Sequence, residues 1–212
     1  VDHHVLDRAN GFRVTEAFVE RIVPGTEAVF ICQPNNPTGL TCSRAVIQAS
    51  LARCEEVGAH LVIDECFVGF LDDPARVSVQ GLLADHPSLI VLKAFTKLYA
   101  MAGIRLGYAL CADQDLVASI QHTGQPWAVS SLAQAAGIAA LGEGAYVEEL
   151  RALIVSERAF LIDGLASWGI KAQGEANFLF FHVDADGFAA RKRAHGVLVR
   201  DCSNYVGLET GW

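Results

Sequence analysis

The sequence of 212 residues lacks the usual marks of a secreted or metal-binding protein. Its first residues, VDHHVLDRANG, include no basic segment followed by an apolar one, so they predict no secretion signal. The six cysteines form no C-x-x-C pair and no Cys/His cluster with zinc spacing, which argues against a metal site. We therefore expect reduced thiols and a cytoplasmic location.

Positive charge is also scarce. The chain has 16 Lys and Arg against 24 Asp and Glu, a formal charge of −8, which argues against a nucleic-acid or anionic-membrane partner. The longest stretch without a charged residue, 116–142, is long enough to span a bilayer. It contains Gln121, His122 and Gln125, which are costly in hydrocarbon. We expect two buried helical pieces separated at TGQPW, and no membrane partner.

Apolar residues are abundant, and their spacing predicts strands that alternate with helices. A hydrophobic content of 52% predicts a sheet buried on both faces. Strands are expected over 28–33, 60–67, 89–95 and 104–111, and a helix over 43–58 with Ser43 as N-cap and Gly58 as its stop. This order predicts an α/β domain with a mostly parallel sheet.

The order of the predicted helices and strands changes near Trp168. Helices are expected over 132–141 and 145–164, followed by a strand-like run at 176–183, a helix near 188–195 and the run VLVRDC at 197–202. These elements predict a large domain over residues 1–165 and part of a smaller α+β domain over 166–212.

Three polar groups stand at the carboxyl ends of predicted strands, where open α/β sheets bind ligands. They are the turn PNNPTG, Asp64 and Lys97. Each has a plain structural explanation when taken alone: an Asn/Pro-rich turn, a helix cap or ion pair, and a solvated lysine. Arg105 alone would be a surface residue. Their coincidence at one edge of a sheet favours a ligand site.

In this order, NNPTG, DECF, TK and IRLGY, the chain resembles the fold-type I pyridoxal-phosphate enzymes, specifically the class I/II aminotransferases, over essentially all its residues. The resemblance implies the three-layer α/β/α large domain of these enzymes and pyridoxal 5′-phosphate (PLP) as cofactor. It implies a lyase or aminotransferase that acts on a small amino acid or phosphorylated amine, and a homodimer.

The resemblance also implies roles for individual residues. Lys97 would form a Schiff base with the cofactor aldehyde and later move a proton at Cα of the substrate. Asp64 would hold the pyridine nitrogen protonated, which makes the ring an electron sink. Asn36 would donate to the phenolic oxygen, and Arg105 would bind the phosphate with its planar fork.

The chain departs from the family pattern at three places. Phe67 stands where many relatives have tyrosine, so Asn36 carries more of the contact with the phenolic oxygen. Ala94 stands where a Ser or Thr usually contacts the phosphate, and Thr96 is expected to substitute in part. The family's upstream phosphate clamp and its downstream substrate-carboxylate arginine fall outside the chain. We therefore expect a fragment that is inactive by itself.

Two branches of the family compete: L-threonine-O-3-phosphate decarboxylase and histidinol-phosphate aminotransferase. The segments KLYAMAGIRLGY, QPWAVSSLAQAAG and VLVRDCSNYVGL favour the decarboxylase. Asn177 is a weaker substrate candidate with a structural alternative at the domain hinge, and Trp127 would either line the substrate side or fill the core.

Two other classes of function remain as alternatives. One is a non-catalytic module that keeps the cofactor pocket. The other is a nucleotide-binding α/β domain, which is disfavoured because no G-x-G-x-x-G or G-x-x-x-x-G-K-[ST] follows any predicted strand.

Overall fold

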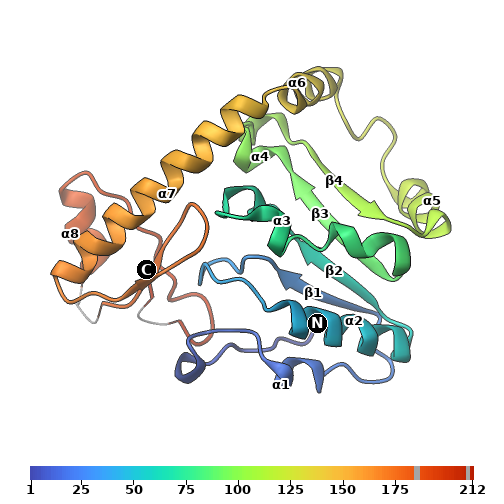
Figure 1. Cartoon of the computed structure of the whole chain (residues 1–212), viewed down its shortest axis with the longest axis horizontal. Coiled ribbons are helices and arrows are strands. Elements are labelled where there is room, and N and C mark those ends of the chain that lie inside the picture. The colour runs from blue at the N-terminus through green and yellow to red at the C-terminus, as the bar shows by residue number, and fades with distance from the viewer. Residues whose placement is uncertain (184–186, 209–210) are drawn as a thin grey trace.

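The structure is a computed structural model that describes residues 1–183, 187–208 and 211–212 (Figure 1). Its centre is a four-stranded sheet in the order β1 (Ala28–Cys32), β2 (His60–Asp64), β3 (Leu89–Ala94) and β4 (Gly107–Cys111). The pairs β1–β2 and β2–β3 are parallel, and β4 is antiparallel to β3. The predicted α/β class with a mostly parallel sheet is confirmed.

The strands are shorter than the sequence predicts, because turns begin where polar or small residues follow them. The second predicted strand ends at Asp64, and a 3-10 helix over Val68–Phe70 follows. The fourth begins at Gly107 rather than Ile104, since 102–104 form a 3-10 turn and Arg105 has a left-handed backbone (φ 59°). Further short elements are 3-10 helices over Arg8–Asn10 and Gln80–Asp85, α1 (Glu16–Val19), α3 (Pro74–Val77) and α4 (Phe95–Leu98).

Helix α2 (Arg44–Val57) has the caps that its sequence predicts. Ser43 Oγ accepts a hydrogen bond from the backbone N–H of Val46 at 3.2 Å, and Gly58 ends the helix with φ 75°. A left-handed terminal residue strains any side chain but is open to glycine. The helix buries Ile47 and Leu51 against the sheet.

The two faces of the sheet differ, which corrects the expectation that both are buried. Val29, Leu61 and Val91 point to the face that α2 covers, and they belong to one apolar core. On the other face, Phe30 is 67% exposed and Ala109 is also exposed. Of the three layers that the resemblance implies, the structure shows the sheet and the α2 layer, and the opposite face is open at β1 and β4.

The uncharged stretch forms two helices, as predicted, but they are not buried. Helix α5 (Gln114–Thr123) buries none of its residues, and α6 (Ser131–Leu141) buries the small residues Ala133, Gly137 and Ala140. No helix within the described ranges has both the length and the apolar run needed to cross a membrane. The absence of charge in this segment therefore does not reflect burial within the described chain.

Helix α7 (Gly144–Ser167) runs as a long diagonal rod from the α4 and α6 end of the sheet to the C-terminal unit (Figure 1). That unit contains the antiparallel pair β5 (Ala172–Gln173) and β6 (Phe180–Phe181), and α8 (Phe188–Ala194). The predicted helix near 188–195 is confirmed. Residues 197–202 have no regular secondary structure.

The first residues of the chain pack onto the C-terminal unit. The rings of Phe12 and Phe180 meet edge to face at 5.4 Å, and Cys202 and Leu208 complete a small apolar cluster with them. The division into domains 1–165 and 166–212 stays a prediction.

Candidate active site

The candidate site lies where three parallel strands end. Cys32 of β1, Asp64 of β2 and Leu92 of β3 are register partners at the carboxyl ends of these strands. Asn36 lies in the turn after β1, and Lys97 lies in α4, directly after β3. The parallel register therefore brings the predicted amide, carboxylate and amine to one edge of the sheet.

Asp64 keeps a half-buried carboxylate with no cationic partner in the described part of the chain. Its Oδ1 accepts a hydrogen bond from the backbone N–H of Cys66 at 3.0 Å. An ionised carboxylate has about four acceptor positions, so further donors can be accommodated. A half-buried carboxylate without a cation favours a protonated or cationic ligand.

Two thiols flank this carboxylate. Burial, followed by the hydrogen bond with Asp64, raises the pKa of the Cys66 thiol to about 12. Burial and then the negative charge of Asp64 also raise the pKa of Cys32. Both thiols therefore stay protonated at neutral pH and are weak nucleophiles. This leaves the amine of Lys97 as the candidate nucleophile at this edge.

Lys97 is exposed, and its amine lies 5.8 Å from the centroid of the Phe67 ring. A ring face at this distance attracts a cation weakly. Phe67 in turn meets Phe178 edge to face at 5.1 Å. The ring of Phe67 thus links the predicted lysine to the segment that carries Asn177, although it cannot supply the hydroxyl that a tyrosine would.

The PNNPTG turn is held rigidly by its own hydrogen bonds. The backbone N–H of Asn35 donates to Leu40 O at 2.8 Å, and the side-chain amide of Asn35 donates to Thr38 Oγ1 at 2.7 Å. Asn36 is exposed, and its own side chain has no hydrogen-bond partner among the residues described. Its amide is therefore accessible to a ligand at the strand ends.

The turn also packs tightly against the segment before Asn177. Gly39 has φ 75°, and a Cβ built on it would lie 2.7 Å from the Cα of Gly174. Any side chain at Gly39 would therefore push the two segments apart. This close approach brings the Asn36 turn beside the loop that leads to Asn177.

That loop is anchored by residues that the sequence reasoning missed. Thr41 Oγ1 donates to the Glu175 carboxylate at 2.6 Å. Arg158 of α7, with an 11% exposed side chain, donates to the backbone oxygens of Glu175 and Ala176 at 2.9 and 3.1 Å and pairs with Asp72. No motif marks Arg158, but the position of Glu175 two residues before Asn177 was a usable signal.

The predicted phosphate-binding residues are not joined to this arrangement by contacts within the described chain. The guanidinium of Arg105 is exposed and donates to the carbonyl of Ala102 at 3.1 Å, within its own turn. Thr96 is half-buried in α4. Asn177 is exposed, and Trp127 is 96% exposed, so Trp127 does not fill the core of the described chain.

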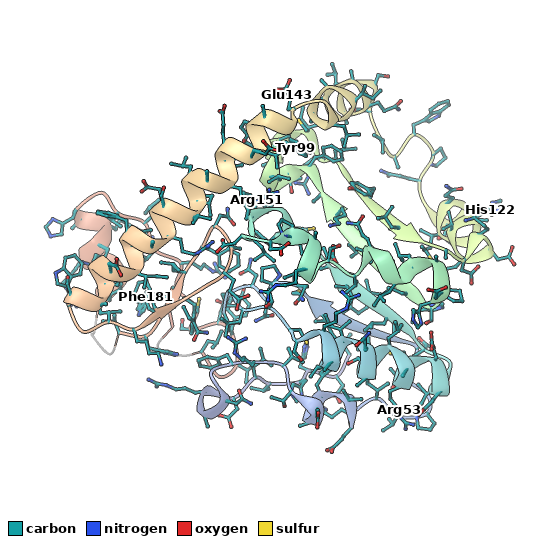
Figure 2. The ribbon with its side chains drawn as sticks, in the orientation of Figure 1. Arg53, Tyr99, His122, Glu143, Arg151 and Phe181 are labelled. Atoms are coloured by element: carbon teal, nitrogen blue, oxygen red, sulfur yellow. The ribbon has the colours of Figure 1, made fainter. Side chains whose placement is uncertain are left out.

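Two hollows lie beside the site on the other side of the strand ends. One of about 370 Å³ is lined by Gly69, Ser78 and Lys93 among others. The second, of about 120 Å³, is lined by Glu65, Lys93 and Tyr99, the last labelled in Figure 2. Neither of these two hollows is lined by Asp64 or Lys97. The described side chains include no group of three or more His, Cys, Asp or Glu arranged to hold a metal ion.

Comparison with known proteins decides the family. The sequence profile described as aminotransferase class I and II matches residues 6–209. The chain belongs to this family. Class I and II aminotransferases depend on PLP, so the enzyme family and the cofactor predicted from the motifs are confirmed.

The threonine-phosphate decarboxylase of Salmonella typhimurium strain LT2 is 32% identical over 209 residues, which are 97% of this chain and 57% of that protein. The histidinol-phosphate aminotransferase of Symbiobacterium thermophilum is 35% identical over 193 residues, 89% of this chain and 52% of that one. The crystal structure of the histidinol-phosphate aminotransferase from Clostridium acetobutylicum has a TM-score of 0.89 at 27% identity and covers 95% of this chain and 62% of that chain. The chain thus spans about half the length of the curated relatives it matches.

The side chains present fit PLP. The cofactor aldehyde needs a primary amine, and Lys97 presents one that has no ion-pair partner in the described ranges. The pyridine nitrogen needs a carboxylate to hold its proton, and Asp64 is half-buried and unpaired at the same edge.

Proposed function

We propose that this chain forms the cofactor-binding core of a PLP-dependent enzyme that acts on a phosphorylated amino acid or amine. The proposal is supported by the positions of Asn36, Asp64 and Lys97 in the fold: Asn36 follows β1, Asp64 ends β2 and Lys97 follows β3. Bound PLP supplies an aldehyde for reaction with amines and a ring that accepts electrons.

Each residue of the chain has a separate task in this proposal. Lys97 holds the cofactor covalently and moves a proton at Cα of the substrate. Asp64 holds a proton at the pyridine nitrogen, and Asn36 donates its side-chain N–H to the phenolic oxygen. Arg105 binds the phosphate with help from Thr96, and Phe67 packs beside the lysine.

Decarboxylation of L-threonine O-3-phosphate is the reaction we favour. The relative that carries this activity in its name matches 97% of the chain. The reaction breaks the bond from Cα to the carboxylate, releases CO2 and places a proton on Cα. Lys97 is the residue that delivers this proton, and Asn177 and Trp127 are weaker candidates for contact with the substrate.

Histidinol-phosphate transamination is the second candidate, because relatives with this name match the chain at 35% identity and at a TM-score of 0.89. Transamination removes the Cα proton instead of the carboxylate, and Lys97 is again the group that moves it. A non-catalytic module that retained the cofactor site is the alternative from another class.

We further propose that the whole protein is a cytoplasmic homodimer without a nucleic-acid partner. Free thiols at all six cysteines support the location. The exposed apolar residues Leu132, Ile138 and Leu141 of α6 support a protein partner on that side of the molecule.

The first test is the absorbance of the purified chain after addition of PLP and removal of the unbound cofactor. We expect a near-visible band that disappears in Lys97→Ala, with the fold retained because this side chain is exposed. Lys192→Ala is a matched control, since the Lys192 amine also lies over a phenylalanine ring, 5.3 Å from the centroid of Phe188, but in α8. A band that persists in Lys97→Ala would overturn the proposal.

The second test assays the protein in its full natural length. CO2 release from O-phosphothreonine supports the decarboxylase, and glutamate formation from histidinol phosphate with 2-oxoglutarate supports the aminotransferase. A lysine-dependent band without either reaction supports the non-catalytic module.

A further inference from the structure

A buried ion pair lies directly behind the candidate site. The Lys93 amine is 2.6 Å from Glu65 Oε2, and the two side chains are 16% and 0% exposed. Glu65 follows Asp64 in the sequence, and Lys93 precedes α4, which carries Lys97. Side chains alternate between faces along a strand, so Asp64 and Glu65 point to opposite sides of the sheet.

Glu65 also ties a third segment to the strand ends. Its Oε1 accepts from the backbone N–H of Val79 at 2.6 Å, and its Oε2 accepts from Ser78 Oγ at 2.8 Å. Its own backbone N–H donates to Leu92 O of β3 at 3.0 Å. One buried carboxylate therefore joins the end of β2, the end of β3 and the segment after α3.

The fourth strand takes part through its register with β3. Tyr108 of β4 is the register partner of Lys93, and Tyr99 and Tyr108 line the 120 Å³ hollow together with the ion pair. Lys93 also borders the 370 Å³ hollow. The pair therefore borders two hollows. Because few side chains pack against the strand ends there, packing alone constrains these ends less than the ion pair does.

Stability alone does not account for such a pair. Removing two charges from water costs about as much as their attraction returns, and a well-packed apolar pair is often equally stable. What the pair adds is a fixed geometry, because the carboxylate must face an amine and two further donors at once. That geometry is set one residue from Asp64 and within the segment that leads into α4.

We propose that Glu65 and Lys93 are positioning residues that hold Asp64 and Lys97 in the arrangement needed for PLP. The proposal deepens the proposed function and rests on it. The ion pair does not touch the cofactor in this account. It fixes the ends of β2 and β3 relative to each other, and these ends set the positions of Asp64 and Lys97.

The test compares four variants with the parent chain. The double variant Glu65→Gln/Lys93→Met removes both charges while its glutamine still accepts from Val79 N–H. Lys93→Arg keeps the pair. Glu56→Gln is the matched control, because it removes a surface pair in which Arg53 and Glu56 lie 2.7 Å apart, on α2. Glu65→Gln/Lys93→Gln, which also removes both charges, serves in place of this double variant if it does not fold.

We expect the double variant to keep a thermal midpoint near that of the parent and to bind PLP about tenfold to a hundredfold more weakly, with a changed absorbance band. Lys93→Arg and Glu56→Gln should bind like the parent. A folded double variant with the parent's Kd and band would overturn the proposal, because a merely structural role changes the midpoint alone.

A second readout needs no cofactor. The backbone N–H of Cys66 donates to Asp64, so its hydrogen exchange reports how well the Asp64 turn is held. We expect the Cys66 N–H to exchange faster in the double variant than in the parent, and at the parent's rate in Glu56→Gln. Unchanged exchange would overturn the positioning role. A parent chain that binds no PLP through Lys97 would instead overturn the proposed function, and the exchange result would still stand by itself.

Discussion

Two adjacent carboxylates on opposite faces of the central sheet differ in burial and in hydrogen bonding. On the face covered by α2, Glu65 is fully buried and satisfied by Lys93, Ser78 and the Val79 N–H. On the face that is open at β1, Asp64 is half-buried and accepts one hydrogen bond, from the Cys66 N–H. Both residues stand at the end of the same strand.

The difference separates structural polar groups from groups kept for a ligand. A buried carboxylate is tolerated when the protein itself supplies its donors, as it does for Glu65. A carboxylate that the protein leaves with unused acceptor positions is suited to an external donor, as we propose for Asp64. Proximity in the sequence therefore does not imply a shared role.

The largest expected effect contrasts these two carboxylates. Glu65→Gln leaves the Lys93 amine without its counter-charge, and we expect the free energy of unfolding to fall by up to about 3–5 kcal/mol. The 16% exposure of the Lys93 side chain places the loss toward the lower end. Asp64→Asn should change that free energy by less than about 1 kcal/mol.

Cofactor affinity should separate the two variants further. Asp64→Asn loses a charge-assisted hydrogen bond to the pyridine nitrogen, which we expect to raise the Kd for PLP about tenfold to a hundredfold. Urea unfolding and absorbance titration measure the two quantities. If Asp64→Asn unfolds as easily as Glu65→Gln and binds PLP normally, the contrast between the faces is wrong.

A second contrast, of similar or smaller size, is between apolar residues on the two faces. Leu61 is fully buried under α2, and Leu61→Ala should cost about 2–5 kcal/mol of unfolding free energy through the cavity it leaves. Phe30 on the opposite face is 67% exposed, and Phe30→Ala should cost less than about 1 kcal/mol. Denaturant unfolding of both variants at several protein concentrations tests this. An equal cost that grows with concentration would show that Phe30 is covered by a second copy in solution.

The smallest effect concerns thiols buried under the covered face. Burial raises the pKa of Cys42 and Cys54 to about 11, from an ordinary value of 9.0. Above pH 9.0 the unfolded chain loses these protons while the folded chain retains them, so stability falls as pH rises from there toward about 11. Thermal midpoints over this range should fall less steeply in Cys54→Val than in the parent. Equal slopes would contradict the prediction.

The local features of the fold could be predicted because short-range physics determines them. The Ser43 cap and the Gly58 stop of α2 depend on hydrogen bonds and backbone angles within a few residues. The second and third strands were predicted to extend beyond their ends at Asp64 and Ala94. Apolar residues continue past the point where the hydrogen bonds of the sheet stop. The run at 197–202 has strand-like composition, but composition alone does not supply a neighbouring strand to pair with.

The burial of the uncharged stretch was the main misjudgement. Residues 116–142 have no Asp, Glu, Lys or Arg, which suggested a buried pair of helices. In the structure α5 has no buried residue and Trp127 is 96% exposed. A sequence shows which side chains favour an apolar environment, but not whether the described chain provides one.

The sequence by itself determined the family and the cofactor and indicated the candidate site residues, because these depend on a fixed order of NNPTG, DECF, TK and IRLGY. The tertiary structure alone decided that Glu65 pairs with Lys93, that Phe67 lies between Lys97 and Phe178, and that Arg158 anchors the loop before Asn177. Such contacts join residues far apart in the chain. They depend on strand register and on the face each side chain occupies, and neither is fixed until the sheet has formed.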